Sequence, residues 1–356
     1  MLYFLISLFG LGIIIFLHEL GHFIMARRHN VAVEEFGIGY PPRLFSFKKN
    51  GIIYSINAIP FGGFTKIVEF GEKNSFASQS LGKRASILIA GVANNFVIAF
   101  LIFTILFTIG MPVFALPFSF QEKAVSRVVI QEVTEESPAF RAGIEVGDVI
   151  LGIKYLDNYY PLNKIQDVQE KTAELEGEKI HLVIERQGNE VEIEVALRQA
   201  AEAEKGYLGV VLTEEGSLKY PFLESLKQSF VLSGVLLQET IIGLGKVFVG
   251  LFSGGGFEGL AGPVGIMAIT TKGFQWGWNY GLYILGLISF AFGFFNLLPI
   301  PAADGGRILF LVIEKIRRRP IAQKTEVLIN NICFSLLMIL LFLVTIKDIK
   351  FFILPR

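Results

Sequence analysis

An HExxH motif occupies residues 18–22, at the end of an apolar run that begins at Leu2. On a helix, His18 and His22 would share one face, where two imidazoles can bind one Zn²⁺ ion while Glu19 takes a proton from a bound water. Chance is a weak explanation, because the chain has only four histidines. The alternative of a surface helix with idle histidines is disfavoured, since polar groups are costly in lipid. The motif therefore predicts a hydrolytic metal site within a membrane.

The composition indicates a membrane protein that carries one soluble insert. Of 356 residues, 52% are hydrophobic, 13% are aromatic and only 18% are charged, which is more apolar sequence than a single globular core needs. The formal net charge is zero and no basic block is interleaved with aromatic residues, so nucleic acid is not an expected partner. The single cysteine, Cys333, excludes an intrachain disulfide.

Four stretches are long and apolar enough to cross a bilayer. They are residues 2–26, 87–109, 278–298 and 327–346. A fifth stretch, 230–252, is interrupted by charged and amide side chains, which favours an amphipathic helix at the interface over a span. The first stretch lacks the positive start and small-residue cleavage site of a signal peptide, so we expect it to be an anchor.

Positive charges predict the orientation of these spans. Lys and Arg residues concentrate in the loop between the first two spans, and such short loops remain in the cytoplasm. They are Arg27, Arg28, Arg43, Lys48, Lys49, Lys66, Lys73, Lys83 and Arg84. A second positive loop, at 307–324, follows the third span. Both termini would then be extracytoplasmic, and His18 would lie about 24 Å from the outer end of its helix, toward the cytoplasmic side.

Asp304 is the candidate for a third metal ligand. Two histidines and a water leave a tetrahedral zinc one protein ligand short. Asp304, one of only five aspartates, follows the third span. That span also runs inward, so its exit and the HExxH motif would lie at the same face. A soluble-protease HExxHxxGxxH arrangement is disfavoured, because its last two positions are Met25 and Arg28. Asp304 could alternatively be only a turn residue before Gly305.

At this point the chain resembles the site-2 proteases, which are zinc intramembrane proteases, and most closely their bacterial regulator-of-sigma-E type. In that family HExxH on the first span pairs with an NxxPxPxxDGG segment on the third, which here is residues 296–306. The resemblance covers nearly the full length and includes residues 90–95 and 260–266.

The resemblance implies roles for individual residues. His18, His22 and Asp304 would bind zinc, with Glu19 as the catalytic base. The pair Asn296 and Pro299 would hold the substrate near the zinc. The chain departs from the usual family pattern at Val92, where Pro is common, at Ala303, where Leu is common, and at Arg307, where His is common. These departures touch no ligand or base, so they bear on geometry and substrate preference.

Residues 43–57 predict a β-hairpin, because an Asn50-Gly51 turn joins two runs of strand formers. This hairpin resembles the re-entrant β-loop of the family. A strand edge near the site could bind an unwound substrate segment by strand addition. A simple surface hairpin is the alternative.

Residues 123–213 are richer in charge and in short strands, which predicts a soluble insert. Ser137 to Gly143 predicts a short helix with a Ser N-cap, Pro at its first position and Gly just after its end. The segment resembles one PDZ domain, which would bind extended peptides or chain ends, or restrict bulky substrates. A rigid spacer without a ligand is the alternative.

The sequence thus predicts a polytopic α-helical membrane protein with about four transmembrane helices, a membrane-associated β-hairpin and an inserted PDZ-like domain. We expect domains at 1–122, 123–215 and 216–356. The predicted function is zinc-dependent cleavage of transmembrane segments of membrane-anchored proteins, such as an anti-sigma factor or remnant signal peptides, in a bacterial inner membrane. The alternatives are an inactive scaffold that binds peptides through its PDZ domain, and a transporter, for which no inverted repeat is evident.

Overall fold

The computed structural model describes residues 1–352 except 72, 114–115, 118–119, 121–124, 187–188, 200–205 and 254–260. The chain forms two compact units, which are described separately. The first comprises Met1–Thr108 and Pro221–Arg356, and the second comprises Ile109–Tyr220. The predicted boundary between 122 and 123 lies outside the described residues, as does Leu260 of the 260–266 segment. The predicted boundary between 215 and 216 lies within strand β9 (Val210–Leu218).

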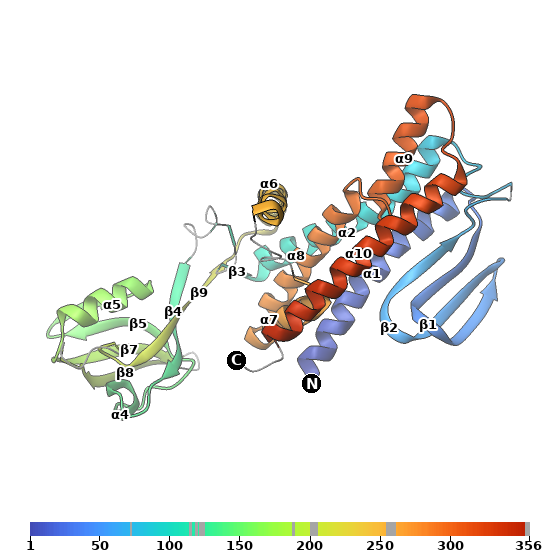
Figure 1. Ribbon diagram of the computed structural model, residues 1–356. Coiled ribbons are helices and arrows are strands. Elements are labelled where there is room, and N and C mark those ends of the chain that lie inside the picture. The colour runs from blue at the N-terminus through green and yellow to red at the C-terminus, as the bar shows by residue number, and fades with distance from the viewer. Residues whose placement is uncertain are drawn as a thin grey trace. The chain divides into compact units, whose positions relative to one another are not determined.

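The first unit is a bundle of long apolar helices (Figure 1). The four predicted spans form α1 (Leu2–Arg28), α2 (Leu81–Ile109), α8 (Trp278–Leu297) and α10 (Gln323–Phe352). Each is long and apolar enough to cross a membrane. Because their surfaces are apolar nearly all round, lipid can face one side of each helix while the helices pack on the other. The chain is therefore an integral membrane protein.

Helix α6 (Phe222–Ser253) differs from the sequence-based expectation. It begins eight residues before the predicted start at Phe230, so that its part Phe222–Val247 is a fifth candidate span by length and composition. In Figure 1, α6 is seen almost along its axis, whereas α1, α2, α8 and α10 run across the view. A buried hydrogen bond of 3.1 Å from Thr104 Oγ1 to Ser229 Oγ joins it to α2. Its composition permits a span, while its direction crosses that of the other long helices.

Helix α7 (Pro263–Trp276) is shorter and folds back against α8 through Gly277, whose φ of 149° favours glycine. Its N-terminus is held by Asp348 of α10. Oδ2 of Asp348 accepts hydrogen bonds from the backbone N–H groups of Gly262 and Gly265, both at 2.8 Å. The Asp348 carboxyl, which is 1% exposed, therefore satisfies two of the free donors at the start of α7.

Strands β1 (Val33–Lys49) and β2 (Ile52–Ile67) form the predicted hairpin, and they extend it back to a Val33–Ile67 pair. Asn50 and Gly51 have φ values of 51° and 81°, the left-handed pair that a tight hairpin turn requires. β2 lies along α1, where Thr65 Oγ1 donates a 2.9 Å hydrogen bond to the Glu19 carbonyl oxygen. The hairpin is thereby placed beside the HExxH motif.

The second unit is a mainly antiparallel sheet around an aliphatic core. Its path is β3-β9-β4-β5-β7-β8, with β6 paired to β5. The strands are β3 (Met111–Pro112), β4 (Val125–Val133), β5 (Val149–Tyr155), β6 (Asn158–Pro161), β7 (Lys179–Arg186), β8 (Asn189–Ala196) and β9. Helix α5 (Ile165–Glu174) and the short α4 (Pro138–Arg141) complete the PDZ-like unit. Strand alternation buries residues such as Ile130, Ile150 and Leu182 in the core.

The predicted short helix is confirmed as α4. Ser137 Oγ accepts from the Phe140 N–H at 3.1 Å, and Gly143 follows the helix with a φ of 78°. The loop after it is fixed by Arg186 of β7, whose guanidinium donates to both carboxyl oxygens of the buried Asp148, at 2.8 and 2.7 Å.

Candidate active site

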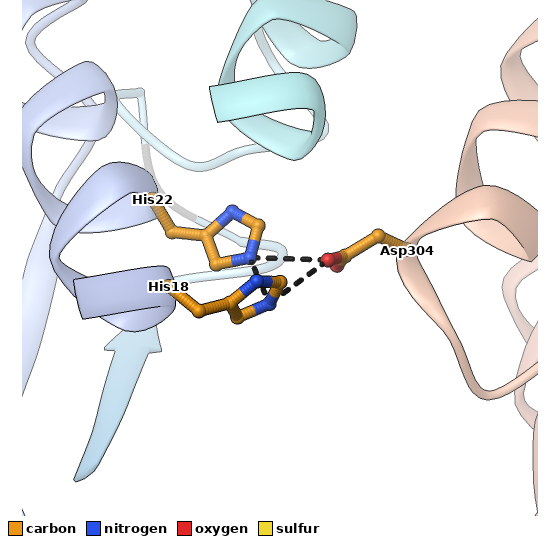
Figure 2. A group of neighbouring side chains, drawn as sticks. All are labelled: His18, His22 and Asp304. Atoms are coloured by element: carbon orange, nitrogen blue, oxygen red, sulfur yellow. Dashed lines mark hydrogen bonds and ion pairs between the residues drawn. The ribbon is translucent and has the colours of Figure 1, made fainter. Parts of the chain in front are cut away.

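The structure brings His18 and His22 of α1 together with Asp304, the first residue of α9 (Asp304–Arg317) (Figure 2). Nε2 of His18 and Nε2 of His22 are 3.1 Å apart. Each lies 3.2 Å from Oδ2 of Asp304. The histidines are 5% and 7% exposed, so three potential ligand atoms meet in a nearly equilateral and buried triangle.

This triangle fits a tetrahedral metal ion. Zinc bonds of ~2.0 Å in a regular tetrahedron would separate ligand atoms by about 3.3 Å, close to the distances observed here. Oδ2 of Asp304 is buried and makes no hydrogen bond of good geometry with any residue that the structure describes. Burial raises the pKa of the Asp304 carboxyl, but the two imidazoles outweigh it and hold the pKa well below its usual range. An anionic oxygen and two imidazole nitrogens form a donor set that suits zinc.

The opposite nitrogen of His22 fixes the state of its ring. Nδ1 of His22 lies 2.9 Å from the carbonyl oxygen of Ile87 in α2. A carbonyl oxygen can only accept, so Nδ1 carries the hydrogen and the neutral ring keeps a free lone pair on Nε2. The nitrogen that faces Asp304 is therefore able to bind a cation.

Residues 90–95 of α2 form the wall behind the two histidines. A Cβ atom on Gly91 would lie 2.3 Å from Nε2 of His22, so only glycine leaves room for this ring. Asn94 Nδ2 donates to the Leu17 carbonyl oxygen at 2.7 Å, and the Asn95 amide lies 2.9 Å from Nδ1 of His18. Residues 90–95, which are part of the resemblance to the site-2 proteases, thus contact α1 at Leu17, His18 and His22.

The turn before α9 places Asp304. Ala302 has a left-handed φ of 78°, and the chain then folds tightly onto itself. A Cβ atom on Gly305 would lie 2.2 Å from the Leu298 carbonyl oxygen, and one on Gly306 would lie 2.3 Å from that of Ile300. The two glycines allow this close approach, which holds the carboxyl at the end of α8.

The triangle lies in the wall of a cavity of about 290 Å³. Glu19 and Asn296 also line this cavity, whereas Pro299 is not among its lining residues. The remaining polar lining residues include Tyr40, Thr65, Glu69 and Arg307. Strand residues of the hairpin and residues of α1, α8 and α9 therefore face one space.

The sequence did not predict a group of charged and aromatic contacts at the edge of this cavity. We call it the Arg307 brace, and it consists of Glu69, Phe76, Arg84, Arg307 and Glu314. Arg307 of α9 donates to both carboxyl oxygens of Glu69, at 2.8 and 2.6 Å. Its guanidinium also lies 4.7 Å from the ring centre of Phe76, and that of Arg84 lies 5.3 Å from the same centre. Arg84 in turn pairs with Glu314 at 2.9 Å. These contacts connect the β2–α2 loop to α9, the helix that carries Asp304. The only sign of them in the sequence was Arg307, which stands where the family commonly has His.

A bundle of apolar helices with a buried His-His-Asp cluster and an adjacent glutamate defines a membrane-embedded metallohydrolase. Comparison with known proteins identifies its family. Residues 6–340 match the model of peptidase family M50. The chain belongs to this family of site-2 proteases and is a zinc metalloprotease.

Bacterial relatives match over almost the whole chain. The zinc metalloprotease RasP of Geobacillus kaustophilus is 29% identical, over 96% of each chain. A Clostridium perfringens protein named as a zinc metalloprotease is 33% identical over 98% of this chain and 99% of its own. A similarly named protein of Clostridium acetobutylicum is 30% identical over 97% of each.

Proposed function

We propose that this protein is an intramembrane endopeptidase that cleaves transmembrane segments of membrane-anchored proteins. The observation that carries the proposal is the triangle of ligand atoms on α1 and α9, at 3.1 to 3.2 Å, beside a cavity that Glu19 also lines. His18, Glu19 and His22 lie on α1, which is a candidate span, and this supports hydrolysis within the membrane.

In this proposal His18, His22 and Asp304 hold the zinc ion. When bound, zinc would act as a Lewis acid that lowers the pKa of a water molecule and polarises the scissile carbonyl. Glu19, as general base, takes a proton from the attacking water and then gives it to the leaving amide nitrogen. His22 is kept in the binding tautomer by its hydrogen bond to Ile87.

The substrate must be extended before it is cut, because the scissile carbonyl of an intact helix is hydrogen-bonded and enclosed. Tyr40 of β1 and Thr65 of β2 line the cavity, so the hairpin is close enough to offer an edge for strand addition. Asn296, whose Nδ2 donates to the Phe292 carbonyl oxygen at 3.0 Å, would contact the substrate from the opposite helix. Pro299 would act by shaping the turn that follows α8.

The positive loops at 27–84 and 307–324 support a bacterial inner-membrane orientation with the active site toward the cytoplasm. Both termini and the PDZ-like unit would then be extracytoplasmic. That unit would bind chain ends of membrane proteins or restrict bulky ones. Membrane-tethered anti-sigma factors and remnant signal peptides are the substrates we propose.

The test is cleavage of a single-pass membrane reporter by purified protein in detergent or liposomes. Glu19→Gln should retain zinc and lose cleavage by at least about 100-fold, because general-base catalysis contributes roughly 10²–10⁴ in rate. The matched control, Glu34→Gln, changes an exposed acid that pairs with Lys66 on the hairpin and should cleave normally. Undiminished cleavage by Glu19→Gln would refute the assigned base. A zinc-loaded wild type that cuts no membrane reporter would favour the peptide-binding scaffold.

A further inference from the structure

Asn95 is a buried amide that faces a proposed metal ligand from the side away from the metal. It is 0% exposed, and its Nδ2 atom as placed lies 2.9 Å from Nδ1 of His18. Its Oδ1 atom has no hydrogen-bond partner among the residues that the structure describes. A polar side chain at such depth is costly to bury, so its position calls for a role.

The two possible orientations of this amide have opposite consequences for His18. If Nδ2 donates to Nδ1, the neutral ring carries its hydrogen on Nε2, and Nε2 has no lone pair for a metal. If the amide is turned by 180°, Oδ1 accepts from Nδ1–H, and the Nε2 lone pair points toward His22 and Asp304. The two orientations have the same shape, and either one leaves one amide atom without a partner, so packing does not choose between them.

Zinc binding by His18 requires the second orientation, because only that one leaves a lone pair on Nε2. We infer that Asn95 is a positioning residue whose Oδ1 accepts a hydrogen bond from Nδ1–H of His18, thereby fixing the ring tautomer and orientation for zinc binding. The inference rests on the proposed role of His18 as a ligand. It gives His18 the same kind of support that the Ile87 carbonyl oxygen gives His22. Helix α2 then supplies both outer hydrogen bonds, one from its main chain and one from a side chain.

The surroundings keep Asn95 in place. Ser289 Oγ of α8 donates to the main-chain carbonyl oxygen of Asn95 at 2.9 Å, in a buried contact. On the same helix, a Cβ atom on Gly293 would lie only 3.2 Å from the Asn95 Cβ atom, so α8 packs closely over this residue. Asn95 is therefore held at the junction of α1, α2 and α8, where the loss of Oδ1 would remove a direct contact with His18.

The test compares zinc affinity in three variants, by competition with a chromophoric chelator. Asn95→Leu removes the acceptor, and its zinc affinity should fall about 10–100-fold, as for other outer partners of metal-bound histidines. Asn95→Asp keeps an acceptor oxygen but has no donor, so its affinity should equal or exceed that of the wild type. Asn94→Leu is the matched control, because the Asn94 amide also contacts α1 but bonds the Leu17 main chain and no histidine. It should bind zinc as the wild type does.

Each outcome bears on a definite claim. An Asn95→Asp protein as weak as Asn95→Leu would overturn the inference, because the amide nitrogen would then be the atom that matters. Unchanged affinity in Asn95→Leu would overturn it as well. Equal losses in Asn94→Leu and Asn95→Leu would show a general packing effect and also contradict it. If Asn95→Leu does not fold, the Asn95→Asp affinity still decides. A folded wild type that binds no zinc would instead refute the proposed function itself.

Discussion

Gly91 of α2 lies directly against the imidazole of His22. A Cβ atom at position 91 would be 2.3 Å from Nε2 and 2.5 Å from Cε1 of that ring, well inside van der Waals contact. The ring cannot retreat freely, because its Nδ1 is hydrogen-bonded to the Ile87 carbonyl oxygen. Helix α2 therefore sets the position of His22 in two ways. Gly91 leaves room for the ring because it has no side chain, and the Ile87 carbonyl oxygen holds Nδ1.

Gly91→Ala should displace His22 and so reduce both zinc content and cleavage, by at least about tenfold for zinc affinity. Gly82→Ala is the matched control, because it makes the same change in α2 at a position where a Cβ meets nothing within 4 Å. The control should be neutral or slightly stabilising, since alanine favours helix over glycine by about 1 kcal/mol. Zinc analysis of both variants checks this, and normal zinc in a folded Gly91→Ala protein would contradict it.

The Arg307 brace predicts an effect on the β2–α2 loop. Arg307→Lys keeps a positive charge but loses the planar guanidinium, which donates to both Glu69 oxygens through Nη2 and lies over the Phe76 ring. We expect faster amide hydrogen exchange in the loop residues 68–71 and 73–80, with a stability change below about 1 kcal/mol because the pair is partly exposed. Zinc content should be unchanged.

Lys66→Met, which removes the exposed Lys66–Glu34 pair on the hairpin, is the control and should leave exchange in that loop unaltered. Mass spectrometry of the exchanged protein measures both variants. Equal exchange in Arg307→Lys and the wild type would show that the brace does not hold the loop.

Asp348 is predicted to dock α10 onto the start of α7. Asp348→Leu leaves the N–H groups of Gly262 and Gly265 without their buried acceptor, and the loss should cost about 1–3 kcal/mol. Asp348→Asn retains one acceptor oxygen and should lose less. Thermal unfolding in detergent provides the measurement, with the exposed Asp157→Asn as control. A wild-type melting temperature for Asp348→Leu would refute this docking role.

Chelation should abolish cleavage reversibly. The side chains of His18, His22 and Asp304 approach one another in a buried site. If they hold zinc as proposed, its removal takes away the Lewis acid that the hydrolysis needs. Cleavage should stop with 1,10-phenanthroline and return when zinc is added. His181→Ala, on β7 of the second unit, should respond to chelator as the wild type does. Cleavage that persists in a zinc-free protein would exclude the metal from the reaction.

The sequence predicted the approach of His18, His22 and Asp304, because helical spacing aligns the first two and span direction places the third. Their roles as zinc ligands, and that of Glu19 as base, remain predictions. Asn95 stood in a recognised segment, yet its contact with His18 depends on the rotation of α2 against α1, which a local pattern does not specify. The Arg307 brace joins residues more than 200 positions apart and escaped for the same reason. The start of α6 was placed too late, because most of residues 222–229 are polar or charged and the continuous apolar run begins only at Phe230.

The most direct measurement of the central claim is zinc content per chain in the purified wild type and in Asp304→Ala. The site is built from two distant segments, so removing the α9 carboxyl should leave only the HExxH histidines to bind the ion. We predict about one zinc per wild-type chain and substantially less in Asp304→Ala, with both proteins folded. Full zinc occupancy in Asp304→Ala, at the affinity of the wild type, would contradict the account.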